Sequence, residues 1–264
     1  MAWTPFHDLS RPSHWGPITS SLLWCEDKYR LTPYMAEPCN TLTNISFVAL
    51  SLYGAYNAQR EQTGRRFVLA YAGVALVGVG SFFFHATLKY EAQLLDELPM
   101  IYTSLLLSYC ILETSPETSP IKRKDGKGGP LLPLLLAGTA VLITVSYLAL
   151  PNPVLHQVSY GAIQIATALR VLYLLYASRS PLVSAPEQRE RIRASYRFGA
   201  AVFIFGFVVW NIDNIWCEGL RVVRARVGNV PGIFFEGHAW WHILTGYGAY
   251  HLVCSASLLS LSLR

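Results

Sequence analysis

The sequence predicts an all-α integral membrane protein, a bundle of seven transmembrane helices with an N-terminal segment at the membrane interface. Of its 264 residues, 52% are hydrophobic and only 14% are charged, and the mean hydropathy is positive. A soluble domain carries about 25% charged residues, so this chain is too apolar to be one. The net charge of +5 comes from loops between apolar stretches, and no nucleic-acid partner is needed to explain it.

Seven stretches are apolar and close to the length of about 20 residues that a helix needs to cross the hydrocarbon core. They cover, approximately, residues 38–57, 67–86, 97–112, 131–150, 154–177, 198–216 and 239–262. Two stretches rich in proline, serine and charge, 114–130 and 177–193, are predicted to be linkers. We therefore divide the chain into a lumenal or interfacial segment at 1–37 and a membrane domain at 38–264.

The basic residues predict the orientation, because Lys and Arg are retained in cytosolic loops. More of them lie in the loops on the side of the C-terminus than on the side of the N-terminus. We expect a lumenal N-terminus and a cytosolic C-terminus, and no cleaved signal peptide, because the chain does not begin with a basic stretch followed by an apolar run. Cys25 and Cys217 both fall on the lumenal side, where an oxidising compartment permits a disulfide between them.

The ionisable residues within the predicted spans are few, and each is a candidate functional residue because a charge in a membrane is costly. The second span ends at His85, four residues after Ser81, and the third opens with Asp96. The seventh opens with His238 and His242, again four residues apart. A spacing of four places two side chains on one helix face. Since successive spans alternate in direction, all five residues are predicted to lie at the lumenal side.

Three neutral imidazoles with an open fourth position are typical of a catalytic zinc site, which lowers the pKa of a bound water to about 7 and polarises a carbonyl group. Asp96 is then placed to orient or deprotonate the water, and Ser81 to stabilise an oxyanion. The alternatives are a hydrogen-bonded helix pair for the two histidines of the seventh span, helix packing for Ser81 and a helix cap for Asp96. His156, at the start of the fifth span, is a rival ligand, and Glu97 is expected to be solvated.

Five motifs follow one another between Trp15 and Gly246: WGPITSSLLWCEDKY, YMAEPCNTLTN, GSFFFHATLKYEAQLLDELPMIY, FVVWNIDNIWCE and GHAWWHILTG. Together they resemble the motifs of the alkaline ceramidase family, including its phytoceramidase branch. The resemblance implies a seven-helix zinc amidase of the endoplasmic reticulum or Golgi membrane. Its substrate would be a membrane lipid, because such enzymes hydrolyse the N-acyl amide of a ceramide, phytoceramide or dihydroceramide to a sphingoid base and a fatty acid.

Residue by residue, the resemblance implies zinc binding by His85, His238 and His242. It also implies Asp96 as the general acid and base, and Ser81 as a group that assists the transition state. Seven-helix receptors of the adiponectin and progestin type resemble this family in fold and zinc ligation, so a non-hydrolytic receptor is the alternative function. The presence of both Ser81 and Asp96 favours the hydrolase.

The family also holds a calcium ion in its N-terminal segment, and this sequence departs from that site. Three residues match family positions: Trp24, Glu26 and Glu37. Leu23 and Lys28, however, stand where the family has Asp and Asn. Calcium takes six to eight oxygen ligands, so the loss of two ligands and the gain of an ammonium argue against it. Our hypothesis is that Lys28 replaces the ion by pairing with Glu26 or Glu37, and a local alternative brings in Asp27 as a calcium ligand.

Overall fold

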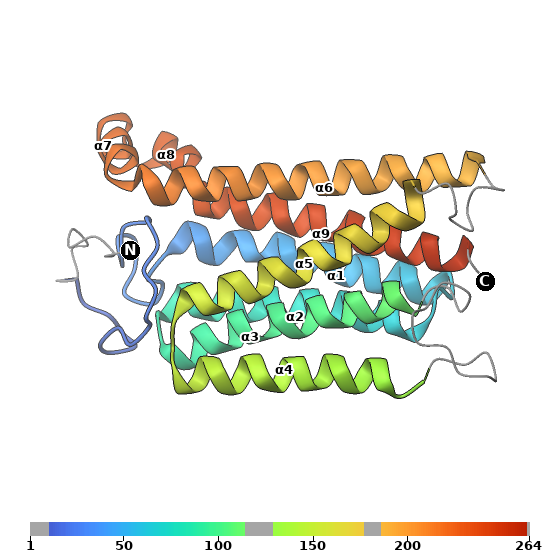
Figure 1. The fold of residues 1–264 in the computed structure, drawn as a ribbon. Helices are drawn as coiled ribbons and strands as arrows, with labels where there is room; N and C mark the ends of the chain where they lie inside the picture. Colours follow the sequence, from blue (N-terminus) through green and yellow to red (C-terminus); the bar gives the residue numbers. More distant parts are fainter. Residues whose placement is uncertain (1–10, 114–128, 177–185, 263–264) are drawn as a thin grey trace.

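The computed structural model describes residues 11–113, 129–176 and 186–262, and within these ranges its regular structure is helical, apart from one isolated bridge between Thr32 and Met35. The elements are α1 (Pro38–Arg60), α2 (Arg65–Thr87), α3 (Tyr90–Leu112), α4 (Leu131–Ala149), α5 (Pro153–Tyr176), α6 (Pro186–Ile215), α7 (Cys217–Val227), α8 (Asn229–Gly232), η2 (Ile233–Phe235) and α9 (Gly237–Ser262). Most of the long helices run side by side, α5 slants across them, and residues 11–37 lie at one end of the bundle (Figure 1).

Every predicted apolar stretch corresponds to one long helix of the structure. Five of the described helices, α2 to α6, are long and apolar enough to cross a membrane. The remaining long helices, α1 and α9, carry polar residues such as Asn40, Asn44 and His242 in their first turns. An all-α, multi-pass membrane protein is therefore supported, and the count of seven spans stays a prediction.

Two helix boundaries differ from the prediction. α3 begins at Tyr90 rather than near residue 97, and α6 begins at Pro186, so that residues 186–193 are helix and not linker. A proline in the first helical turn followed by Glu, Gln and Arg favours a helix, although these residues are too polar for a hydropathy scan to include. The other parts of the predicted linkers, 114–128 and 177–185, lie outside the described residues. The short elements between α6 and α9 were not predicted: α7, α8 and η2.

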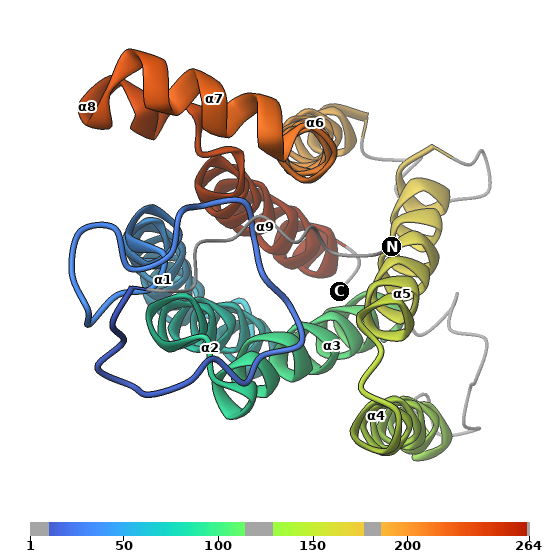
Figure 2. The same ribbon diagram turned by 90° about the vertical axis from the view of Figure 1, so that its left-hand side faces the viewer.

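Residues 11–37, which we call the N-terminal segment from here on, run across the ends of α1, α2 and α3 (Figure 2). Backbone hydrogen bonds join the segment to the end of α2: Ser20 N–H donates to Leu88 O at 3.1 Å, and Glu37 N–H donates to His85 O at 3.0 Å. A buried apolar cluster joins the segment to the end of α2, and it consists of Leu22, Trp24, Tyr29, Ala36, Phe84 and Leu88. The segment is therefore packed onto the bundle as a cover over one end.

The main apolar core lies in the half of the bundle away from the N-terminal segment. α4 lies at the edge of the bundle, as Figure 2 shows. This core includes Phe67, Tyr71, Ile111, Leu174 and Leu259. Two glycines face each other where α6 packs against α9. A β-carbon built on Gly248 would lie 2.9 Å from Gly199 O, so small residues set the distance between these helices.

Candidate metal centre

The three predicted histidine ligands come together at the covered end of the bundle. His85 lies in the last turn of α2, and His238 and His242 lie in the first two turns of α9. All three are buried, and one ring nitrogen of each lies within 4.8 Å of the others. The start of α9 is held by Asp213 of α6, whose Oδ1 accepts a hydrogen bond from Gly237 N–H at 3.0 Å and so satisfies a backbone donor at the helix N-terminus.

Two of the imidazoles have a polar partner on the side facing away from the group. His85 Nδ1 lies 2.5 Å from Glu37 Oε2, and His242 Nδ1 lies 3.0 Å from Thr43 Oγ1. A carboxylate bound at Nδ1 fixes the tautomer that presents the Nε2 lone pair to a metal. His85 Nε2 and His238 Nδ1 are buried and make no hydrogen bond within the described ranges. Buried nitrogen atoms without a partner, in a set of three imidazoles, fit a zinc ion.

Aromatic side chains close the group from the side of the N-terminal segment. The ring of Trp24 packs on the imidazole of His238, with 4.3 Å between the ring centroids. Trp210 of α6 packs against Trp24 in turn, at 5.6 Å. These rings exclude water from one side of the histidines and tie the N-terminal segment to α6.

Ser81 and Asp96 meet where α2 crosses α3. A β-carbon on Gly80 would lie 2.0 Å from Leu95 O, so the two backbones touch here and bring the next residue of each helix together. The Ser81 hydroxyl faces the Asp96 carboxyl group, and Ser81 is buried. Because α3 begins at Tyr90, Asp96 lies within the helix and is not its cap. The pair lies one helical turn before His85 and supplies a carboxyl group and a hydroxyl group there.

Glu97 and His156 belong to a different polar cluster. The prediction that Glu97 is solvated was wrong: its side chain is buried, and its Oε2 accepts hydrogen bonds from Gln93 Nε2 at 2.8 Å and Tyr147 O–H at 2.5 Å. His156 Nε2 donates to Glu97 O at 2.8 Å. His156 is therefore outside the histidine group, and the cluster fastens α4 and α5 to α3.

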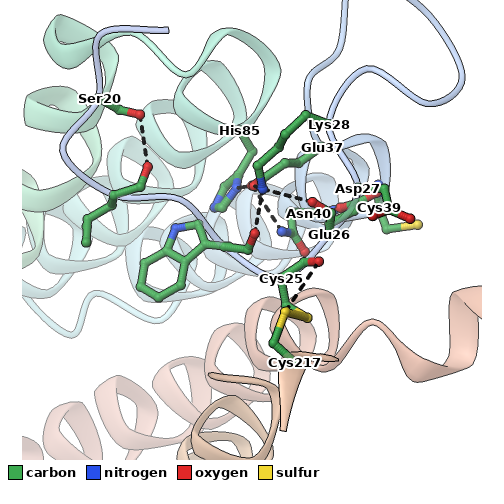
Figure 3. A network of polar contacts seen from close by, with 12 residues as sticks. Ser20, Cys25, Glu26, Asp27, Lys28, Glu37, Cys39, Asn40, His85 and Cys217 are labelled. Carbon is green, nitrogen blue, oxygen red and sulfur yellow. Dashed lines mark hydrogen bonds and ion pairs between the residues drawn. A yellow bond between two sulfur atoms is a disulfide. The ribbon is translucent and has the colours of Figure 1, made fainter. Parts of the chain in front are cut away.

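Lys28 lies at the centre of the polar network in the N-terminal segment (Figure 3). Its Nζ donates to Trp24 O at 2.5 Å, to Glu26 O at 2.8 Å and to Glu37 Oε1. The Lys28 side chain thus pairs with Glu37, and its contact with Glu26 is to the backbone. The carboxylate of Glu26 instead accepts hydrogen bonds from the backbone N–H groups of Cys39 at 2.7 Å and Asn40 at 2.8 Å, which caps the N-terminus of α1.

The two glutamates of this network differ in their protonation. Burial and the charge of Glu37 raise the pKa of Glu26 to about 7, although the N–H groups of Asn40 and Cys39 act to lower it. Burial also acts to raise the pKa of Glu37, but Lys28 and His85 outweigh it and hold that pKa well below its usual range. Glu37 is therefore a fixed negative charge, with Lys28, His85 and Asn40 around its carboxylate.

A disulfide between Cys25 and Cys217 joins the N-terminal segment to the start of α7. Arg224, also on α7, is buried and donates from Nη2 to Cys25 O at 2.9 Å. Its Nη1 lies 3.0 Å from Glu236 Oε2, two residues before the first histidine of α9. α7 therefore fixes the N-terminal segment and the start of α9 to each other.

Sequence reasoning missed Thr43 and Arg224. A signal existed for Thr43, because PCNTLTN places Asn40, Thr43 and Asn44 in a predicted span, where polar side chains are functional candidates. Arg224 gave no signal, since it stands beside Arg221 and Arg226 in a short basic stretch. Its burial depends on how α7 folds back over the bundle.

The chain is similar to known proteins over most of its length. A protein-family model described as Ceramidase matches residues 16–264. Alkaline ceramidase 3 of Mus musculus is 39% identical over 257 residues, covering 97% of this chain and 90% of the mouse protein. An alkaline ceramidase of Saccharomyces cerevisiae is 35% identical, covering 95% of this chain and 79% of the yeast protein. An alkaline ceramidase of Arabidopsis thaliana is 28% identical, with coverages of 90% and 83%.

Proposed function

Because this chain belongs to the ceramidase family and is an enzyme of that kind, we propose that it hydrolyses the N-acyl amide bond of a ceramide, phytoceramide or dihydroceramide by means of a zinc ion. The proposed ligands are His85, His238 and His242. The observation that carries the proposal is the convergence of these three buried imidazoles, with Ser81 and Asp96 facing each other one helical turn before His85. The nitrogen donors favour zinc over calcium or magnesium, which take oxygen ligands.

Zinc held by three imidazoles supplies a water of lowered pKa and polarises a carbonyl oxygen. In the proposed reaction, Asp96 takes a proton from the attacking water at a carboxylate oxygen and returns it to the amide nitrogen as the C–N bond breaks. The Ser81 hydroxyl donates a hydrogen bond to the oxygen on which negative charge develops. The oxygen of the water ends in the carboxyl group of the fatty acid, and the nitrogen leaves as the amine of the sphingoid base.

A cavity of about 130 Å³ lies between α3, α5, α6 and α9, in the half of the bundle away from the N-terminal segment. Its lining is mostly apolar and includes Leu107, Val171, Ala200 and Leu252. Leu252 follows His242 by ten residues, or about 15 Å along the helix. The hydrocarbon core of a bilayer is about 30 Å thick, so one layer of lipid tails is about 15 Å deep. The distance from His242 to Leu252 along the helix therefore equals the length of one lipid tail layer. We propose that the cavity receives the end of one substrate tail, whose burial contributes about 0.8 kcal/mol per CH₂.

We propose that the enzyme resides in the membrane of the endoplasmic reticulum or Golgi, with its N-terminus in the lumen and its C-terminus in the cytosol. The distribution of basic residues supports this orientation. The disulfide at the covered end of the bundle also supports it, because disulfides persist in an oxidising compartment. The presence of Ser81 and Asp96, which face each other on α2 and α3, supports a hydrolase over a non-hydrolytic receptor.

The proposal is tested by incubating purified, zinc-loaded protein with ceramides of several acyl lengths and measuring the sphingoid base released. Asp96→Asn is expected to retain zinc and to be at least about 10²-fold slower. Glu91→Gln, which changes an exposed carboxylate in the first turn of the same helix, is the matched control and is expected to keep the wild-type rate. No release from any ceramide by the wild-type protein, or equal rates for wild type and Asp96→Asn, would contradict the proposal.

A further inference from the structure

The Lys28 ammonium is buried and fully paired. Its side chain has no exposed surface, and an ammonium has three N–H donors. Three oxygen atoms accept them: the backbone oxygens of Trp24 and Glu26 and the Oε1 atom of Glu37. Each N–H donor of the ammonium therefore has one acceptor, as expected of a charged lysine buried in the N-terminal segment.

The carboxylate of Glu37 lies between the charged group of Lys28 and the ring of His85. Oε1 accepts from Lys28. Oε2 contacts His85 Nδ1 at 2.5 Å and also accepts from Asn40 Nδ2 at 3.1 Å. The side chains of Glu37, Lys28 and His85 have no exposed surface. A buried carboxylate without a cation is strongly unfavourable, so the negative charge that holds the His85 ring depends on the positive charge of Lys28.

We propose that Lys28 is a positioning residue of the metal centre, whose ammonium is the fixed cation that keeps Glu37 in place against the zinc ligand His85. This inference rests on the proposed zinc site, and it explains how the ring of the ligand His85 is oriented. A dissolved cation is not needed in the N-terminal segment, because the lysine carries the charge on the chain itself.

The remaining carboxylates of the segment are engaged elsewhere and leave too few ligands for calcium. Glu26 accepts hydrogen bonds from the first turn of α1. Asp27, which the sequence left open as a calcium ligand, has its Oδ1 2.8 Å from Arg221 Nη2 on α7. The oxygens around Lys28 Nζ are thus two backbone carbonyls and one carboxylate oxygen, fewer than the six to eight that calcium takes.

The test measures zinc affinity by competition with a chelator for the purified wild-type protein, Lys28→Met and Lys89→Met. Methionine keeps much of the length of lysine and removes the charge. Lys89 is a matched control, because its Nζ also holds the N-terminal segment, through Pro17 O at 2.6 Å, without contacting Glu37. We expect Lys28→Met to bind zinc about 10- to 100-fold more weakly, and Lys89→Met to bind it as the wild type does.

A second variant separates charge from packing. Lys28→Ala removes the three methylene groups and the ammonium beyond the β-carbon. We expect added propylammonium, which has the same heavy atoms, to restore zinc affinity in part, whereas propanol at the same concentration does not. Wild-type protein treated with a calcium-selective chelator is expected to keep its zinc affinity, a readout that does not depend on whether either variant folds.

The inference would be overturned if Lys28→Met kept the wild-type zinc affinity or if both lysine variants had equal effects. Equal rescue by propanol, or a wild-type protein that loses zinc affinity when calcium is removed, would also overturn it. These outcomes differ from failure of the proposed function, in which the wild-type protein itself binds no zinc and cleaves no ceramide.

Discussion

Gly80 on α2 lies directly against the carbonyl group of Leu95 on α3, so that a β-carbon on Gly80 would lie 2.0 Å from the Leu95 oxygen. This contact fixes the distance between the two helices one residue before Ser81 and one residue before Asp96. Side chains as short as serine and aspartate can pair only if their helices touch. The position of the proposed acid and base is therefore set by a glycine that takes no part in the chemistry.

Gly80→Ala is expected to destabilise the protein by about 1 to 3 kcal/mol through overpacking. It is also expected to slow ceramide hydrolysis by up to about 10²-fold, because separation of the helices displaces the acid from the reacting atoms. Gly138→Ala on α4 is the control, since nothing lies within 4 Å of its β-carbon. Thermal unfolding and kcat measured for both variants check this prediction, and a Gly80 variant as active as the Gly138 variant would contradict it.

Ser81→Ala is expected to lower kcat by roughly 10²-fold, in line with the loss of one donor to a developing oxyanion. Zinc content should not change, because Ser81 is not a proposed ligand. Metal analysis beside kinetics on one ceramide makes the measurement. If Ser81→Ala lost zinc, or kept its full kcat, the residue would have a structural role and not the proposed one.

The disulfide between Cys25 and Cys217 is expected to stabilise the fold, because it holds the N-terminal segment to α7. Cys25→Ser should lower the free energy of unfolding by about 2 to 4 kcal/mol. The double variant with Cys217→Ser should be no less stable than either single variant, since both remove the same bond. Cys254→Ser, at a free cysteine, is the control. Additive losses in the double variant under non-reducing conditions would argue against a bond between the two.

Ala200→Leu is expected to shorten the acyl chains that the enzyme accepts. Ala200 lines the cavity, and a methylene group in a hydrophobic pocket changes discrimination by roughly tenfold or more. The adjacent Ala201→Leu is the control, because Ala201 is exposed on the outer face of α6. The ratio of kcat/KM for a long and a short N-acyl chain should fall in the first variant and not in the second. Equal ratios would show that the cavity does not receive a tail.

The sequence predicts the helices and the three histidines for simple physical reasons. Long apolar runs have few stable forms in a bilayer other than helices, and two histidines four residues apart must share a helix face. The alternation of span direction then predicts that His85 and the α9 histidines meet at one end, and the structure places them there.

The remaining features depend on contacts that the chain makes only when folded. Hydropathy indicates which part of a helix contacts lipid and does not indicate the first residue of the helix. The first residues of α3 and α6 are polar, so both helices begin earlier in the chain than the apolar stretches predict. The burial of Glu97 depends on Tyr147, 50 residues later in the chain. Whether Lys28 pairs with Glu26 or Glu37 depends on the backbone path of the N-terminal segment, which has little regular structure to predict.

The central claim is that His85, His238 and His242 hold one catalytic zinc ion. The most direct measurement is the zinc content of purified wild-type protein, His242→Ala and His251→Ala, each followed by ceramide hydrolysis. His251 lies on the same helix but outside the histidine group, so its variant is the matched control. We predict one zinc ion per chain and full activity for wild type and His251→Ala, and loss of both for His242→Ala. A His242→Ala protein that retains zinc and hydrolyses ceramide at the wild-type rate would contradict the account.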